Sequence, residues 1–197
     1  MNTNLTNSIE HKEFHSKLGM IILLSSLTML FIALFASYGI LRARSNVWKY
    51  NTIDLSSLIF LWSNTGILIF SSITYHIMSQ NKIQKKKWRT RRRYKHVLKW
   101  LNITLATGLL FLISQILLWF NLYSTGYRIT SHQISSFFYL FSGLHGLHIV
   151  GGLISLIWLK NTIRASNRYT NQIQLVGMFW HFLTVVWLII FSLIIMH

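Results

Sequence analysis

Three histidines within long apolar stretches are the side chains of this chain best suited to chemistry. His145 and His148 lie three residues apart, so a helix places both on nearly one face, and His181 lies in the last apolar stretch. Imidazoles ligate heme iron and other metals, carry protons, or hydrogen-bond inside a helix bundle. An ionisable side chain deep in a membrane helix normally points into protein, which suits each of these roles.

The composition separates these possibilities. The 197 residues include no cysteine, which excludes a disulfide, an iron–sulfur cluster, a thiolate copper site and covalent heme attachment. A pair of bis-histidine hemes needs four intramembrane histidines, so at most a single heme b is left open. Glu10, Glu13 and Asp54 lie outside the apolar stretches, which argues against a proton-coupled transporter.

We favour structural roles for the three histidines. An unpaired buried polar group is costly in lipid, so we expect each imidazole to hydrogen-bond to a hydroxyl, a carbonyl or a tryptophan. On this interpretation the chain holds no cofactor and no metal, and a heme b-binding membrane cytochrome is the weaker alternative.

Five apolar stretches, each long enough for a transmembrane helix, must position these side chains. About 20 residues at 1.5 Å per residue cross the roughly 30 Å hydrocarbon core. No stretch alternates as a barrel strand does, and 52% of the residues are apolar. The sequence therefore predicts an all-α polytopic membrane protein with a polar cytoplasmic tail over 1–16 and a five-helix membrane domain over 17–197. The expected spans are 18–41, 55–78, 97–120, 134–159 and 173–196.

The basic residues, which give a net charge of +16, predict the orientation of these spans. Fifteen Lys and Arg residues lie in the tail and in the second and fourth connections, against four in the first and third connections. The richer side is normally cytoplasmic, so we expect the N-terminus inside and the C-terminus outside, and no nucleic-acid partner. The segment 81–100 holds ten of these cations together with Trp88, Tyr94 and Trp100, and we interpret it as a loop on anionic lipid or on another subunit.

Glycines gather around the histidines of the fourth stretch. Gly143, Gly146, Gly151 and Gly152 are small enough to let a neighbouring backbone come close. We therefore expect the fourth and last stretches to pack together through these glycines, and a bulky residue at position 146 to be costly.

The second stretch carries two polar pairs about two turns apart. Asn64 with Thr65 and Ser71 with Ser72 predict a helix face that hydrogen-bonds to a neighbouring helix. Such a bond is worth about 0.6 to 2 kcal/mol in a membrane.

Segment 138–153, FYLFSGLHGLHIVGGL, resembles the HGLH-containing helix of the cytochrome c oxidase subunit 3 family, which is subunit III of the heme-copper oxidases. The two polar pairs of the second stretch also match this family. The matching residues in the third and last stretches are Gly108, Phe111, Gln115, Trp119, Trp180, His181, Phe182 and Trp187.

The chain also departs from the family pattern. Leu27, Leu118 and Thr184 stand where the family carries carboxyl side chains, and the family's usual first two helices have no counterpart. The resemblance therefore implies a five-helix form of subunit III, and the lost carboxyls argue against direct proton carriage by this chain.

The resemblance implies a non-catalytic subunit of a proton-pumping terminal oxidase in the bacterial inner membrane, within respiratory electron transport. Heme and copper are then expected in the partner subunits I and II, and a larger respiratory supercomplex is a further expected partner. The chain would stabilise subunit I, hold membrane phospholipids beside it and assist proton delivery. Quinol oxidases share this subunit, so the electron donor stays open.

No catalytic or metal-binding residue is expected. The residues assigned to helix packing or to a subunit or lipid interface are Asn64, Thr65, Ser71, Ser72, Gly108, Gln115, Gly143, His145, Gly146, His148, Gly151, Trp180, His181 and Trp187.

Overall fold

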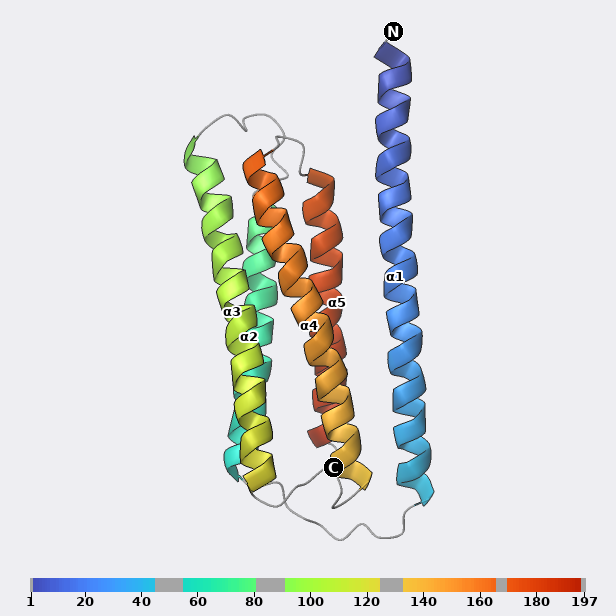
Figure 1. Ribbon diagram of the computed structural model, residues 1–197, viewed down its shortest axis with the longest axis vertical. Helices are drawn as coiled ribbons and strands as arrows, with labels where there is room; N and C mark the ends of the chain where they lie inside the picture. Colours follow the sequence, from blue (N-terminus) through green and yellow to red (C-terminus); the bar gives the residue numbers. More distant parts are fainter. Residues whose placement is uncertain (1, 45–54, 81–90, 125–132, 166–169, 196–197) are drawn as a thin grey trace. The chain divides into compact units, whose positions relative to one another are not determined.

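The computed structural model describes five stretches of the chain, and all of them are helical (Figure 1). An all-α fold is therefore confirmed for the described residues. The chain has two compact units, residues 1–49, which contain α1, and residues 50–197, which contain α2 to α5. The helices are α1 Asn2–Arg44, α2 Leu55–Gln80, α3 Arg91–Ser124, α4 Gln133–Ala165 and α5 Thr170–Ile195.

Each helix contains a segment long and apolar enough to cross a membrane, which confirms the prediction of five transmembrane helices. The shortest of these segments has 23 residues. At 1.5 Å per residue such a segment is about 35 Å long, enough for the hydrocarbon core of a bilayer. The segments are Phe14–Leu41, Leu58–Gln80, Lys95–Ser124, Ser136–Ile163 and Asn171–Leu193.

Helix α1 is one continuous helix of 43 residues. It begins at Asn2, so the polar residues expected to form a separate tail continue without a break into the first span. Within the span, the hydroxyls of Thr28 and Ser37 donate to the carbonyls one turn earlier, at 2.7 and 2.9 Å. These bonds satisfy polar side chains inside the helix itself, as a membrane segment requires.

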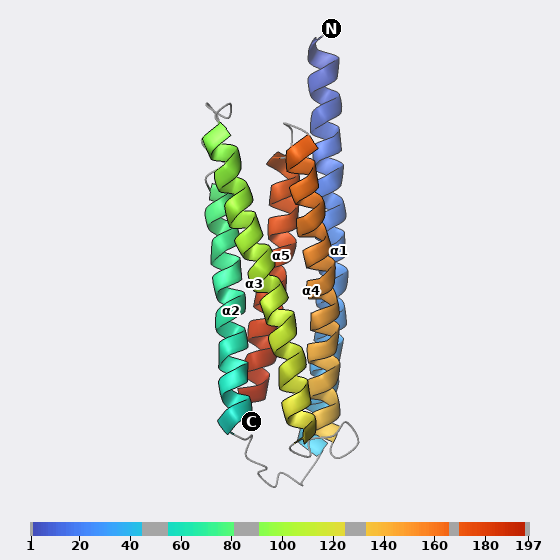
Figure 2. The same cartoon turned by 60° about the vertical axis from the view of Figure 1, so that its left-hand side comes forward.

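Helices α2 to α5 form a four-helix unit in which neighbours are antiparallel (Figure 2). Helix α2 packs against α3 and α5, and α4 also packs against α3 and α5. The register of α2 and α3 shows the antiparallel arrangement directly, because Asn64 pairs with Gln115 and Thr74 pairs with Thr104.

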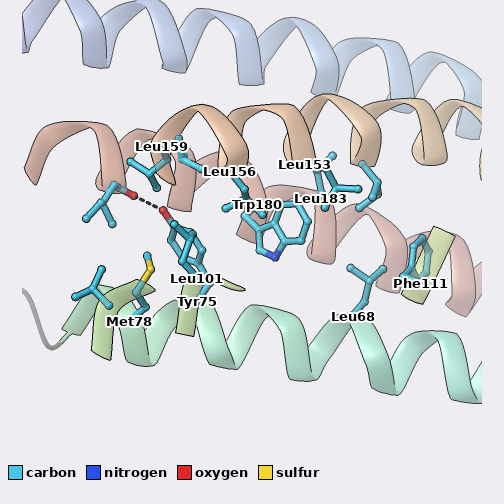
Figure 3. Close-up of a cluster of buried hydrophobic side chains, with 14 of the residues drawn as sticks. Leu68, Tyr75, Met78, Leu101, Phe111, Leu153, Leu156, Leu159, Trp180 and Leu183 are labelled. Atoms are coloured by element: carbon cyan, nitrogen blue, oxygen red, sulfur yellow. Dashed lines mark hydrogen bonds between the residues drawn. The ribbon is translucent and has the colours of Figure 1, made fainter. Parts of the chain in front are cut away.

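The unit is apolar both inside and outside. Large side chains fill its centre, and the outer faces of the same helices carry exposed residues such as Ile69, Leu110 and Ile154. A helix that is apolar all round is typical of a membrane bundle, where lipid replaces water at the surface. The labelled core residues in Figure 3 are Leu68, Tyr75, Met78, Leu101, Phe111, Leu153, Leu156, Leu159, Trp180 and Leu183.

The interpretation of 81–100 as a loop is wrong for its second half. Helix α3 begins at Arg91, six residues before the start of the expected third span at 97. Val97 and Leu101 are buried in the core, so tertiary packing extends the helix back into the basic segment despite repulsion among its like charges. Residues 81–90 lie outside the described part of the chain.

Candidate functional site

Two sets of buried residues, each containing polar side chains, cross the four-helix unit at different heights. We call the first the Trp180 layer and the second the His145 layer. The Trp180 layer comprises Ser71, Thr104, Gly108, Gly152 and Trp180. The His145 layer comprises Asn64, Thr65, Gln115, His145 and Trp187. All ten residues are buried.

Glycines on two helices make room for the indole of Trp180 on α5. A methyl group at Gly108 of α3 would lie 2.9 Å from this ring, and one at Gly152 of α4 would also lie 2.9 Å from it. Both distances are too short for ordinary carbon contact, so only glycine fits at either position without a shift of the ring. Figure 3 shows Trp180 among the core side chains.

Hydrogen bonds complete the Trp180 layer. The indole Nε1 of Trp180 donates to Ser71 Oγ at 3.3 Å, and Ser71 Oγ in turn donates to the Thr104 carbonyl at 3.3 Å. Thr104 Oγ1 lies 3.0 Å from Thr74 Oγ1. Helices α2, α3 and α5 are therefore joined by one polar chain, while α4 contributes the close approach at Gly152.

In the His145 layer, an amide pair joins α2 to α3 and an indole joins α5 to α2. Asn64 Nδ2 donates to Gln115 Oε1 at 3.0 Å. Trp187 Nε1 donates to Thr65 Oγ1 at 3.1 Å, and the same hydroxyl donates to the Leu61 carbonyl at 2.9 Å. The prediction that the polar face of the second span bonds to its neighbours is confirmed, with α3 and α5 as the two neighbours.

His145 is fully buried, and the hydrogen-bond partner predicted for it is not among the described residues. Neither ring nitrogen has a partner among the described residues. The imidazole instead packs on Trp187, with ring centres 5.2 Å apart and planes at 33°, and against the edge of Phe111 at 6.0 Å. Aromatic packing has taken the place that the sequence analysis gave to a polar partner.

The contacts between α3 and α4 place Gln115 near the height of His145. Trp119 Nε1 donates to Ser142 Oγ at 3.1 Å, and Gly108 faces Leu153 further along the same pair of helices. In an antiparallel pair, each residue forward along α3 corresponds to one residue backward along α4. Gln115 therefore lies opposite Gly146, the residue that follows His145. Asn64 Oδ1 and Gln115 Nε2 also lack partners within the described helices, so this layer is only partly satisfied.

The other two histidines are half-buried and hydrogen-bonded. His181 Nδ1 lies 2.6 Å from Ser72 Oγ on α2, which confirms the hydroxyl partner expected for it. His148 Nδ1 lies 2.7 Å from the Leu144 carbonyl of its own helix. Exposed His76 lies beside His181, with ring centres 6.0 Å apart, and pairs with Gln80 at 2.8 Å.

The prediction that the fourth and last spans pack through the glycines near the histidines is confirmed at Gly152, and not at Gly143, Gly146 or Gly151. Helices α4 and α5 do pack together, but the contact lies at Gly152. A methyl group at Gly146 would only reach 4.0 Å from Leu112 of α3, and one at Gly143 would lie 3.7 Å from Trp119. Gly151 has no atom within 4 Å of such a methyl group.

The sequence analysis did not single out Gly152 among the four glycines, although helical periodicity contains the signal for it. Gly152 follows His145 by seven residues, or nearly two turns, and therefore shares its inward face. Gly151 is rotated from that face by about 100° and is exposed. The choice between the two adjacent glycines follows from the position of the buried histidine.

A tyrosine–glycine contact between α2 and α5 was also missed. Tyr75 Oη donates to the Ile173 carbonyl at 2.7 Å, and this bond is the dashed line in Figure 3. A methyl group at Gly177 would lie 2.7 Å from the tyrosine ring. Nothing in the sequence pairs position 75 with position 177 until the register of the two helices is known.

The part of the chain that the structure describes contains no cluster of three or more His, Cys, Asp or Glu side chains able to hold a metal ion. The absence of a cofactor from this chain therefore stays a prediction. The arrangement of both layers is that of helix packing, with polar groups used to join neighbouring helices.

Comparison with known proteins gives one consistent match. The family model described as "Cytochrome c oxidase subunit III" matches residues 7–197. The chain is 31% identical to cytochrome c oxidase subunit 3 of Thermostichus vulcanus, over 94% of this chain and 88% of the relative. It is 32% identical to cytochrome c oxidase subunit 3 of Bacillus subtilis, over 90% of this chain and 84% of the relative.

Proposed function

Because the chain belongs to the cytochrome c oxidase subunit III family, we propose that it stabilises the redox-active part of a terminal oxidase without taking part in the chemistry. It is a multi-pass protein of the bacterial plasma membrane and a subunit of a heme-copper oxidase. In this proposal subunits I and II hold the heme and copper, and the chain packs against subunit I and holds phospholipid beside it.

The observation that carries the proposal is how the buried polar groups are used. Ser71, Thr65 and Gln115 bond across to other helices, so they serve to join the bundle. None of the three acidic residues of the chain falls inside one of the five spans. Proton carriage through a membrane interior needs titratable groups or ordered water, so this interior suits a structural role.

The positions of the family's missing carboxyls support the same conclusion. Leu118 is fully buried in a small apolar cluster with Leu61 and Leu122. Thr184 is buried and donates its hydroxyl to the Trp180 carbonyl of its own helix at 3.2 Å. Both side chains act as packing residues in the four-helix unit.

The outer surface supports the proposed contacts with lipid and with subunit I. Large apolar side chains are exposed on α2, α3, α4 and α5, for example Phe70, Leu117, Trp158 and Leu188. Apolar faces of this kind are covered in a membrane by acyl chains or by another helix.

Oxygen consumption by the purified oxidase, measured with and without this chain over many turnovers, tests the proposal. We expect the initial rate to stay near that of the intact enzyme and to decay faster when the chain is removed. Immediate and complete loss of activity with spectrally intact hemes would contradict it.

The proposed orientation, with the N-terminus inside and the C-terminus outside, follows from the distribution of Lys and Arg. A reporter that is active only outside the cytoplasm should be active when fused after His197. Activity of the same reporter in segment 82–99, with none at the C-terminus, would reverse the orientation.

A further inference from the structure

Two histidines on neighbouring helices meet where α2 packs against α5, outside both polar layers. His76 of α2 is exposed and His181 of α5 is half-buried. Their ring centres lie 6.0 Å apart, with planes at 68°. The ring of Tyr75 lies edge-on to His181 at 5.9 Å. Since α2 and α5 are in direct contact, the two imidazoles are held by the same four-helix unit.

Ser72 holds the imidazole of His181 in one orientation. Ser72 Oγ lies 2.6 Å from His181 Nδ1, and His181 Nε2 has no hydrogen bond within the described residues. A hydrogen bond to one ring nitrogen is the usual way in which a metal-ligating histidine is oriented. With Nδ1 donating to the hydroxyl, Nε2 carries the lone pair that a metal ion requires. His181 therefore offers one oriented ligand.

His76 offers a second ligand, beside an amide. Its Nε2 lies 2.8 Å from the side-chain nitrogen of Gln80, one turn later on α2. An amide nitrogen is only a donor, so Nε2 of His76 is the acceptor in this contact and carries a lone pair. Gln80 is exposed, and rotation of its amide brings the oxygen to the position of the nitrogen. The amide oxygen is therefore available as a third ligand.

The separation of the two rings suits one shared ion. Zinc lies about 2.1 Å from a histidine nitrogen, and therefore about 3 Å from the ring centre, so two imidazoles on one ion have centres about 5 to 6 Å apart. The observed 6.0 Å is at the upper end of this range. Because His76 is exposed, a turn of its ring brings the nitrogen to the ion without movement of either helix.

We propose that His76, His181 and Gln80 form a site for a divalent transition-metal ion between α2 and α5. Imidazole ligands favour Zn²⁺ and its neighbours over Mg²⁺ or Ca²⁺. The two imidazoles and the amide oxygen supply three ligands, and water supplies the fourth of a tetrahedral set. The ion exchanges with solution and is not a resident cofactor. The sequence analysis expected no metal-binding residue, because the pairing of positions 76 and 181 depends on the register of the two helices.

Equilibrium dialysis of the intact purified oxidase against Zn²⁺, followed by elemental mass spectrometry, tests the site. We expect His76→Gln and His181→Gln each to bind one zinc ion fewer per complex than the unchanged enzyme. His76→Gln is the decisive variant, because this exposed side chain is not part of the core. The matched control His96→Gln removes another exposed histidine, which lies beside Trp100 on α3, and should keep that zinc.

X-ray absorption at the zinc edge then counts the ligands of this ion. The difference between the unchanged enzyme and His76→Gln should show two imidazole nitrogens at about 2.0 Å together with oxygen ligands. A single imidazole, or loss of zinc in His76→Gln but not in His181→Gln, would mean an adventitious ion only and would overturn the proposal. Equal zinc in all of these proteins would overturn it as well. None of these results bears on the proposed function, which is tested by the decay of activity without the chain.

Discussion

Trp180 and His145 are both fully buried side chains with ring nitrogens, and their surroundings in the four-helix unit differ. The indole of Trp180 is enclosed by Gly108 and Gly152 and donates to Ser71. The imidazole of His145 packs against Trp187 and has no hydrogen-bond partner among the described residues. Close packing by glycine and a hydrogen bond coincide at Trp180, whereas His145 is held by aromatic contact.

The difference shows that a conspicuous polar residue is not the one that determines the packing. The histidines of the HGLH segment draw attention in the sequence, yet the close approach of α4 to α5 occurs at Gly152. The surroundings of Trp180 should therefore be intolerant of added volume, whereas position 145 should tolerate the loss of its polar atoms.

The largest effect is expected at Gly152. Gly152→Ala puts a methyl group 2.9 Å from the Trp180 ring, and overpacking of this kind costs about 1 to 3 kcal/mol of stability. The neighbouring control Gly151→Ala meets no atom within 4 Å and should be neutral or slightly stabilising. Loss of the subunit from the oxidase on heating in detergent measures the difference, and equal effects of the two changes would refute the close-packing account.

Replacing the two inward histidines should give effects of opposite sign. His145→Leu removes two unpartnered polar atoms from the core and should stabilise the chain by about 1 kcal/mol. His181→Leu leaves Ser72 without its partner and should cost about 1 kcal/mol. Thermal unfolding of the chain in lipid nanodiscs compares the two variants. Equal destabilisation would mean that His145 gains a polar partner in the membrane.

The fold was predictable because membrane helices are set by the length of apolar stretches. Five such stretches are enough to predict five helices, since every backbone polar group in lipid must bond within its own helix. The sequence analysis missed the start of α3 at Arg91 because the like charges of 91–99 argue locally against a helix. The burial of Val97 and Leu101, which favours the helix, depends on the neighbouring helices.

The residue types of the site could be predicted from the sequence, whereas the hydrogen-bond partner of each residue could not. The sequence marks Asn64 and Ser71 as residues that bond to a neighbouring helix, but the choice of Gln115 and Trp180 as partners depends on the register between helices. The missing partner of His145 could not be predicted, because an aromatic contact with Trp187 requires both helices to be in place.

The amide pair of the His145 layer should show a moderate coupling. Asn64→Leu and Gln115→Leu each leave one buried amide alone, and the double change removes both amides together. A double-mutant cycle on stability in nanodiscs should give a coupling of about 0.6 to 1.7 kcal/mol, the range found for hydrogen bonds inside membranes. Additive effects would show that the bond at 3.0 Å contributes nothing to stability.

The smallest effect is expected for the hydroxyl that joins α2 to α5 in the same layer. Thr65→Val keeps the shape of the side chain but removes the acceptor of the Trp187 indole, which should cost about 0.6 kcal/mol. Thr107→Val is the matched control, because within the described part of the chain the Thr107 hydroxyl bonds only to the Ile103 and Thr104 carbonyls of its own helix. This change should have almost no effect. The aromatic contact of Trp187 with His145 remains in Thr65→Val, so fluorescence of that indole should shift to reflect a lost hydrogen bond while the ring stays buried. Destabilisation by Thr65→Val as strong as that by Gly152→Ala would contradict the contrast between the two layers. The His145 layer would then depend on its hydrogen bonds as much as the Trp180 layer depends on its glycines.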